Sequence, residues 1–313
     1  MSRLFCLFAL LFVANAQAEV RVLTSIKPLQ LIAAAVQDGV GEPEVLLPPG
    51  ASPHHYALRP SDVRRVNDAD LLYWVGADLE NFLPRVLSNR QKPQVAVQDL
   101  PGMALRHFGD SHAEHGHDDH DDHEHEHADD ALGHDHDHRP GSLDAHLWLS
   151  PVNAKVIAKR MAADLSKLDA ANAVRYAANL EAFEQRLDAL DERIRAQLAA
   201  LQGKPYFVFH EAFDYFEAAY ELKHAGVFSV LTEVQPGARH VAAMRERLQQ
   251  AGPSCVFSEP PLRPRLAETL TAGLPVKLAE LDALGGTLPV DATGYEQLLQ
   301  NLAGGLSECL NSL

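Results

Sequence analysis

The sequence "ANAVRYAANLEAFEQRLDALDERIRAQLAALQG", residues 171–203, is the stretch that decides the fold. Its large apolar residues recur every three or four positions, which is the period of one face of an α-helix. They are Leu180, Phe183, Leu187, Leu190, Ile194, Leu198 and Leu201. Neither Gly nor Pro interrupts the pattern before Gly203, so we predict one helix of roughly 45 Å. A helix of that length can join two lobes and hold them at a fixed spacing.

Short strand patterns alternate with helical patterns on both sides of this helix. "VRVLT" and "LLYWV" precede it, and "YFVF", "SCVFS" and "PVKLAEL" follow it. This alternation is typical of α/β units with mostly parallel sheets. We therefore predict an α/β fold with an N-terminal lobe at 19–170, a rigid connecting helix at 171–203 and a C-terminal lobe at 204–313.

The N-terminus has the pattern of a secretory signal peptide. Arg3 precedes an apolar run from Leu4 to Val13, and Ala16-Gln17-Ala18 matches a small-residue cleavage site. The run is too short to span a bilayer. We predict that residues 1–18 are removed and that the mature chain is exported and not membrane-embedded. A buried first helix is the alternative.

Export changes the interpretation of the three cysteines. Cys6 lies within the predicted signal peptide, which leaves Cys255 and Cys309 in the mature chain. Two cysteines in an oxidising compartment favour a disulfide that ties the C-terminal segment to the strand around Cys255. Two free buried thiols are the alternative.

Acidity in this chain is concentrated in one segment, residues 107–140. Residues 107–138 contain 12 of the 43 acidic residues and 11 of the 17 histidines, and neither Lys nor Arg. Few of its residues can pack in a core, so we expect disorder in the absence of metal. Tracts of this composition gather metal ions, although a merely solvated acidic loop is the alternative. Since the chain has no basic patch, nucleic acid is not an expected partner.

Three histidines outside the acidic segment have positions suited to a ligand site. His54 follows the strand pattern "EVLL", His210 ends "YFVF", and His146 precedes a helix capped by Ser150 and begun by Pro151. Ligands of open parallel sheets bind beyond the carboxyl ends of the strands. Three converging imidazoles would suit tetrahedral zinc. The residues are widely separated in the chain, so their spacing alone does not establish a site.

Four longer motifs occur in order along nearly the whole mature chain. They are "GASPHHYALRPSDV" (50–63), "DAHLWLSP" (144–151), "GKPYFVFHEAFDYF" (203–216) and "EVQPGARH" (233–240). Together with the acidic His-rich segment, they resemble the periplasmic zinc-binding proteins of high-affinity ABC zinc uptake systems. Those proteins belong to the cluster of metal-specific solute-binding proteins.

The resemblance implies a metal site in the cleft between the lobes. Its motifs place ligands at His54, His146 and His210, and an imidazole at position 210 favours zinc over manganese. The resemblance also places a carboxylate ligand at Asp282. His55 or a water molecule remains an alternative fourth ligand.

The implied function is capture of Zn²⁺ in the periplasm and delivery to an inner-membrane ABC permease, without catalysis. We expect the chain to act as a monomer, with Glu259 accepting an imidazole N–H near the site. A manganese- or iron-binding protein of the same fold is one alternative. A secreted zinc hydrolase is another, although no helix pairs two ligands with a general base.

Overall fold

The computed structural model describes residues 19–109, 141–228, 238–260 and 265–313. The predicted signal peptide at 1–18 lies outside the described residues, and so do residues 110–140 of the acidic segment. Among the helices of the described ranges, none combines the length and apolarity required to cross a bilayer.

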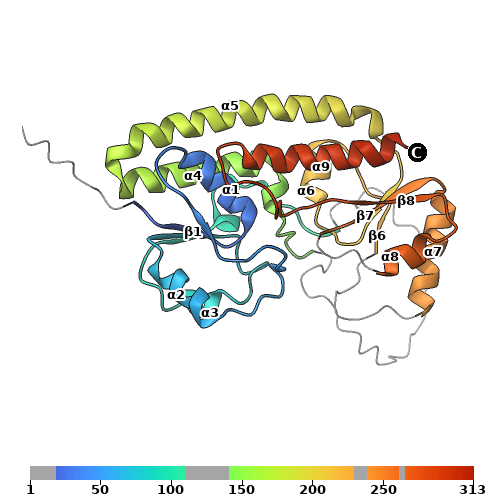
Figure 1. The fold of residues 1–313 in the computed structure, drawn as a ribbon, viewed down its shortest axis with the longest axis horizontal. Helices are drawn as coiled ribbons and strands as arrows, with labels where there is room; N and C mark the ends of the chain where they lie inside the picture. The colour runs from blue at the N-terminus through green and yellow to red at the C-terminus, as the bar shows by residue number, and fades with distance from the viewer. Residues whose placement is uncertain (1–18, 110–140, 229–237, 261–264) are drawn as a thin grey trace, which may run out of the picture.

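The N-terminal lobe is built on a four-stranded parallel sheet in the order β2-β1-β3-β4. Its strands are β1 (Val22–Thr24), β2 (Glu44–Val45), β3 (Leu71–Trp74) and β4 (Gln94–Ala96). Its helices are α1 (Lys27–Val36), α2 (Pro60–Asp68), α3 (Pro84–Leu87), the short η1 (Val97–Asp99) and η4 (Leu147–Leu149), and α4 (Pro151–Leu168). Figure 1 shows α1 and α4 above this sheet and α2 and α3 below it.

The C-terminal lobe repeats this strand order with a second parallel sheet, β6-β5-β7-β8. Its strands are β5 (Tyr206–Val208), β6 (Gly226–Val227), β7 (Ser254–Ser258) and β8 (Val276–Glu280). Its helices are α6 (Asp214–Ala219), α7 (Ala238–Ala251), α8 (Arg265–Thr271) and α9 (Gly294–Asn311). In each sheet the second strand of the chain lies at one edge, so the carboxyl ends of the first and third strands are adjacent. The predicted α/β fold with two lobes is confirmed.

The long connecting helix is also confirmed. The segment comprises η5 (Ala170–Asn172), α5 (Ala173–Leu198) and η6 (Ala199–Leu201). Its predicted apolar face is buried except for Leu180, which is partly buried. Figure 1 shows α5 extending along one side of both lobes, and it packs against α4, α1 and α9. The domain bounds at 170/171 and 203/204 stay a prediction.

Both faces of the C-terminal sheet are covered. Side chains alternate along a strand, so Tyr206 and Val208 join the main core with α5 and α9. Phe207 and Val256 instead join a second core with Met244 of α7 and residues of α8. A sheet held from both sides is a stiff support for the residues that follow its strands.

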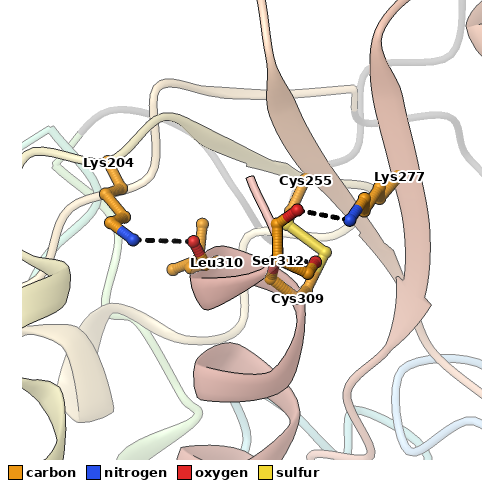
Figure 2. The surroundings of a disulfide bond; sticks show 6 residues. All are labelled: Lys204, Cys255, Lys277, Cys309, Leu310 and Ser312. Carbon is orange, nitrogen blue, oxygen red and sulfur yellow. Dashed lines mark hydrogen bonds between the residues drawn. A yellow bond between two sulfur atoms is a disulfide. The ribbon is translucent and has the colours of Figure 1, made fainter.

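The predicted disulfide between Cys255 and Cys309 is present and ties β7 to the last turn of α9 (Figure 2). Lys204 Nζ donates to the carbonyl of Leu310 at 2.8 Å, and Lys277 Nζ donates to that of Ser312. Lysines at a helix C-terminus satisfy carbonyls that lack partners within the helix. The end of α9 is therefore fixed covalently and by two charged donors.

Candidate metal centre

Each of the three predicted histidines is positioned by a different element. His54 lies in the loop that follows β2, and its backbone N–H donates to the hydroxyl of Ser52. His210 lies two residues beyond β5. His146 immediately precedes η4, and the predicted cap of α4 is confirmed because Ser150 Oγ accepts from the N–H of Asn153. All three residues face the space between the lobes.

The structure brings these three side chains together. Their ligand nitrogens lie within 4.8 Å of one another. The ring centroid of His146 is 4.8 Å from that of His210 and 5.3 Å from that of His54. The Nε2 atoms of His54 and His146 are 3.3 Å apart. Two ligands each about 2.05 Å from a tetrahedral zinc ion would be about 3.3 Å apart. The spacing of His54 and His146 therefore fits two ligands of one zinc ion.

A buried carboxylate fixes the tautomer of His146. Nδ1 of His146 lies 2.7 Å from Oδ1 of Asp144, which also accepts the backbone N–H of His146 at 2.9 Å. When Asp144 is ionised, Nδ1 carries the proton and Nε2 presents a lone pair toward His54. Two nitrogens at their observed separation require a shared proton or a cation between them. A metal ion would meet this requirement.

Asp144, which contacts His146 through Oδ1, was not predicted from the sequence. It is fully buried, and burial raises the pKa of its carboxyl well above the usual range, while the backbone N–H of His146 opposes the rise. A cation on His146 would also favour the ionised carboxylate. The sequence contains an Asp-x-His pattern in "DAHLWLSP". This pattern alone does not predict a contact, because the contact depends on the burial of both side chains.

His210 is oriented in the same way from the C-terminal lobe. Its Nδ1 lies 2.7 Å from Oε1 of Glu259, which follows β7. This is the contact expected for Glu259 from the sequence. The carboxylate–histidine arrangement is the usual support of a metal ligand, since it sets the ring direction and raises the basicity of the other nitrogen.

The structure does not bring Asp282 into the group of three histidines. Its Oδ1 accepts the N–H groups of Leu284 and Gly285, and its Oδ2 accepts that of Gly286. The loop nonetheless meets the N-terminal lobe, because Leu284 and Gly286 line a pocket with residues 47–51. Oδ2 retains one lone pair, whereas both lone pairs of Oδ1 are engaged, and Asp282 as fourth ligand stays a prediction.

Trp148 connects this loop to the histidine site. Its ring lies edge-on to His146 at 5.4 Å, and its Nε1 donates to the carbonyl of Ala283 at 2.8 Å. Tyr295 of α9 donates to the carbonyl of Trp148. His55 is exposed, with its ring 6.3 Å from that of His54, and it is not part of the group.

A second group of potential ligands among the described residues consists of Glu211, Asp214 and His224. Nδ1 of His224 donates to Glu217, whose oxygens lie at 2.9 and 3.0 Å. Burial alone would lower the pKa of His224, but the hydrogen bond and charge of Glu217 and the charge of Asp214 raise it. Pairing with carboxylates accounts for this cluster without a metal ion.

Comparison with solved structures identifies the fold. A crystal structure of ZnuA superposes with a TM-score of 0.73 at 21% identity, covering 93% of this chain and 98% of that chain. The solute-binding protein FpvC of Pseudomonas aeruginosa, in complex with Ni²⁺, gives 0.71 at 20% identity, covering 94% and 97%. At these identities the likeness shows the fold. The three histidines lie between the two lobes of this fold.

Sequence comparison identifies the family. The model of the zinc-uptake complex component A, periplasmic (ZnuA), matches residues 22–309. The high-affinity zinc uptake system protein ZnuA of Yersinia pestis is 40% identical over 295 residues, covering 94% of this chain and 92% of that protein. Its counterpart in Haemophilus influenzae is 36% identical over 325 residues, covering 96% of each. The chain belongs to the ZnuA family and is a transport component, not an enzyme.

Proposed function

We infer that this chain captures Zn²⁺ in the periplasm as the binding component of a ZnuABC-type uptake system. The observation that carries the inference is the convergence of His54, His146 and His210 from both lobes, with two Nε2 atoms 3.3 Å apart. Family membership supplies the periplasmic location and the transport context. Zinc is the cargo of this site.

We propose that the three imidazoles are the protein ligands and that Asp282 supplies the fourth, with water or His55 as alternatives. Three neutral nitrogen ligands suit zinc, whereas manganese favours carboxylate and water oxygens. Two of the imidazoles donate from Nδ1 to carboxylates, which directs Nε2 to the ion. This donor set argues against the manganese- or iron-binding alternative.

We propose that the loaded chain, as a monomer, docks on an inner-membrane ABC permease and releases zinc there. The acidic segment, which lies mainly outside the described residues, is proposed to gather zinc or to sense its abundance. A role for it stays a prediction. The ligand site and the segment must therefore be tested separately.

The test is zinc titration by calorimetry of protein in which residues 110–140 are replaced by a short Gly/Ser linker. The expected result is one tight site that is lost in the His54→Ala/His146→Ala/His210→Ala variant. Tight 1:1 binding by that triple variant would disprove the ligand assignment. Equal or better retention of Mn²⁺ in competition with Zn²⁺ would overturn the choice of metal.

Asp282 needs its own variant. Asp282→Asn retains one acceptor oxygen for the N–H groups of Leu284 and Gly285 but loses the acceptor for Gly286, and it is a poor zinc ligand. If Asp282 binds the ion, the variant should weaken zinc and alter the Co²⁺ absorption spectrum. An unchanged spectrum and affinity would assign the fourth position to water or His55.

A further inference from the structure

The acidic segment departs from and returns to the fold through a short antiparallel pair. His107 pairs with Leu143 in an antiparallel bridge. Phe108 N donates to the carbonyl of Ser142 at 3.0 Å, and Asp144 N donates to the carbonyl of Arg106 at 2.9 Å. We call residues 106–108 and 142–144 the stem. Its second strand ends at Asp144, the residue that orients His146.

One side chain from the opposite lobe holds both strands of the stem. The hydroxyl of Tyr215, on α6, accepts the backbone N–H of Arg106 at 2.9 Å. The same hydroxyl donates to the carbonyl of Asp144 at 2.9 Å. A tyrosine hydroxyl has one proton and acceptor lone pairs, so these two bonds use it as donor and as acceptor. Tyr215 is only 3% exposed, so both bonds are shielded from water.

The position of Asp144 depends strongly on these main-chain bonds. Its Oδ1 binds only groups of His146, and its buried Oδ2 has no hydrogen-bond partner among the described residues. The side chain therefore lacks an anchor in the described structure other than the ligand that it orients. What fixes the carboxylate in space is its backbone, held by Arg106 and by Tyr215.

We propose that Tyr215 is a positioning residue of the zinc site. It fixes the main chain of Asp144 against the C-terminal lobe, and Asp144 in turn sets the tautomer and direction of His146. Tyr215 follows His210 by five residues on the same lobe. Its bonds to the stem therefore also help to set the distance between His146 and His210. This inference rests on the proposed function, since it assigns a role toward the same three-histidine site.

The first experiment compares Tyr215→Phe with a matched control, Tyr176→Phe. Tyr176 is also buried, and its hydroxyl donates to Asp169 at 2.9 Å, at the junction of α4 and α5. Losing a partner of a metal ligand costs roughly 10- to 100-fold in metal affinity. Tyr215 acts one residue further out, so we expect a loss of roughly 3- to 10-fold for Tyr215→Phe and none for Tyr176→Phe.

Affinity is measured by competition with a chelator, and the geometry by the visible absorption bands of Co²⁺ in the site. Tyr215→Phe should shift these bands, whereas a purely structural role would lower thermal stability and leave them unchanged. The shift should persist when residues 110–140 are replaced by a linker, because the bonds lie within the stem. Its disappearance in that background would overturn the proposal.

A double-mutant cycle tests whether Tyr215 acts through Asp144. If it does, Tyr215→Phe should add no further loss of zinc affinity in an Asp144→Ala background. Additive losses would contradict the proposal, as would wild-type affinity and spectrum in Tyr215→Phe. In either case His146→Ala should still lose zinc, which separates failure of this inference from failure of the proposed function.

Discussion

The two sides of the metal centre differ in their exposure to water. On the side of the N-terminal lobe, the His146 side chain is 3% exposed and its Asp144 partner is 0% exposed. On the side of the C-terminal lobe, His210 is 32% exposed and its Glu259 partner is 26% exposed. Both pairs have the same 2.7 Å contact. Because hydrogen bonds are stronger in a low dielectric and buried unpaired groups are more costly, identical geometry should have unequal consequences.

The largest expected effect is removal of the buried ligand. His146→Ala deletes a proposed zinc ligand and also leaves the buried Asp144 without its partner. We expect a loss of roughly 1000-fold in zinc affinity, about 4 kcal/mol. His210→Ala should lose roughly tenfold less, because water can reach the vacated position. Chelator competition on both variants checks this, and equal losses would break the comparison.

Glu80 is a second buried carboxylate of the N-terminal lobe, and burial affects its protonation as well. It is 0% exposed, accepts the N–H of Gly76 at 3.0 Å, and burial raises its pKa from 4.5 to about 7. The folded chain therefore holds the proton more tightly than the unfolded chain. The resulting stabilisation is complete below the unfolded pKa and is lost as pH rises through about 7.

Glu80→Gln removes this dependence on pH. Relative to wild type, the variant should gain about 2.5 kcal/mol in unfolding free energy between pH 5 and pH 8. Urea unfolding of the metal-free proteins at both pH values measures the change, with the exposed Glu181→Gln as control. A constant difference between Glu80→Gln and wild type would show that Glu80 titrates in the folded chain as it does in the unfolded chain.

The next effect concerns the buried partner of His146. Asp144→Asn keeps the size of the side chain but removes its charge and permits an amide donor toward the ring. We expect zinc affinity to fall roughly 10- to 100-fold. Titration with zinc and with Co²⁺ should show a tight site replaced by a weaker one. Wild-type affinity would mean that the buried carboxylate does not support the ligand.

The smallest effect is expected at the exposed partner. Glu259→Gln should weaken zinc binding by less than about tenfold, because water can take over the contact with Nδ1 of His210. Titration with zinc and with Co²⁺ again measures the effect. The informative quantity is the ratio of the affinity loss in Asp144→Asn to that in Glu259→Gln. A loss at Glu259 equal to or larger than that at Asp144 would reverse the order that burial predicts.

Local patterns predicted much of the fold. The helix at 171–203 was evident because its apolar face repeats at the helical period over the whole segment. Helix α9 was not predicted, since Gly304 and Gly305 interrupt it. It forms because its Leu-rich face is buried in the core. Gly305 packs closely on β8, where a Cβ would lie 3.3 Å from the carbonyl of Glu280. Tertiary packing outweighs helix propensity there.

The site was predictable only in part. The three histidines are distant in the chain. Local patterns placed each of them near a strand end or a helix start, and family resemblance was needed to predict that they form one site. Asp144 and Tyr215 could not be identified, because their roles depend on burial and on hydrogen bonds across the lobes. Asp282 is the reverse case. Family resemblance predicted it as a ligand, and in the structure its carboxylate accepts three backbone N–H groups of its own loop.

The central claim is that His54, His146 and His210 together bind one zinc ion between the lobes. X-ray absorption at the zinc edge tests it most directly, on protein loaded one to one with residues 110–140 replaced by a linker. The expected spectrum is that of a four-coordinate ion with nitrogen ligands at about 2.0 Å and the outer-shell scattering of three imidazoles. A six-coordinate oxygen shell, or three imidazoles still present in the triple-alanine variant, would contradict it.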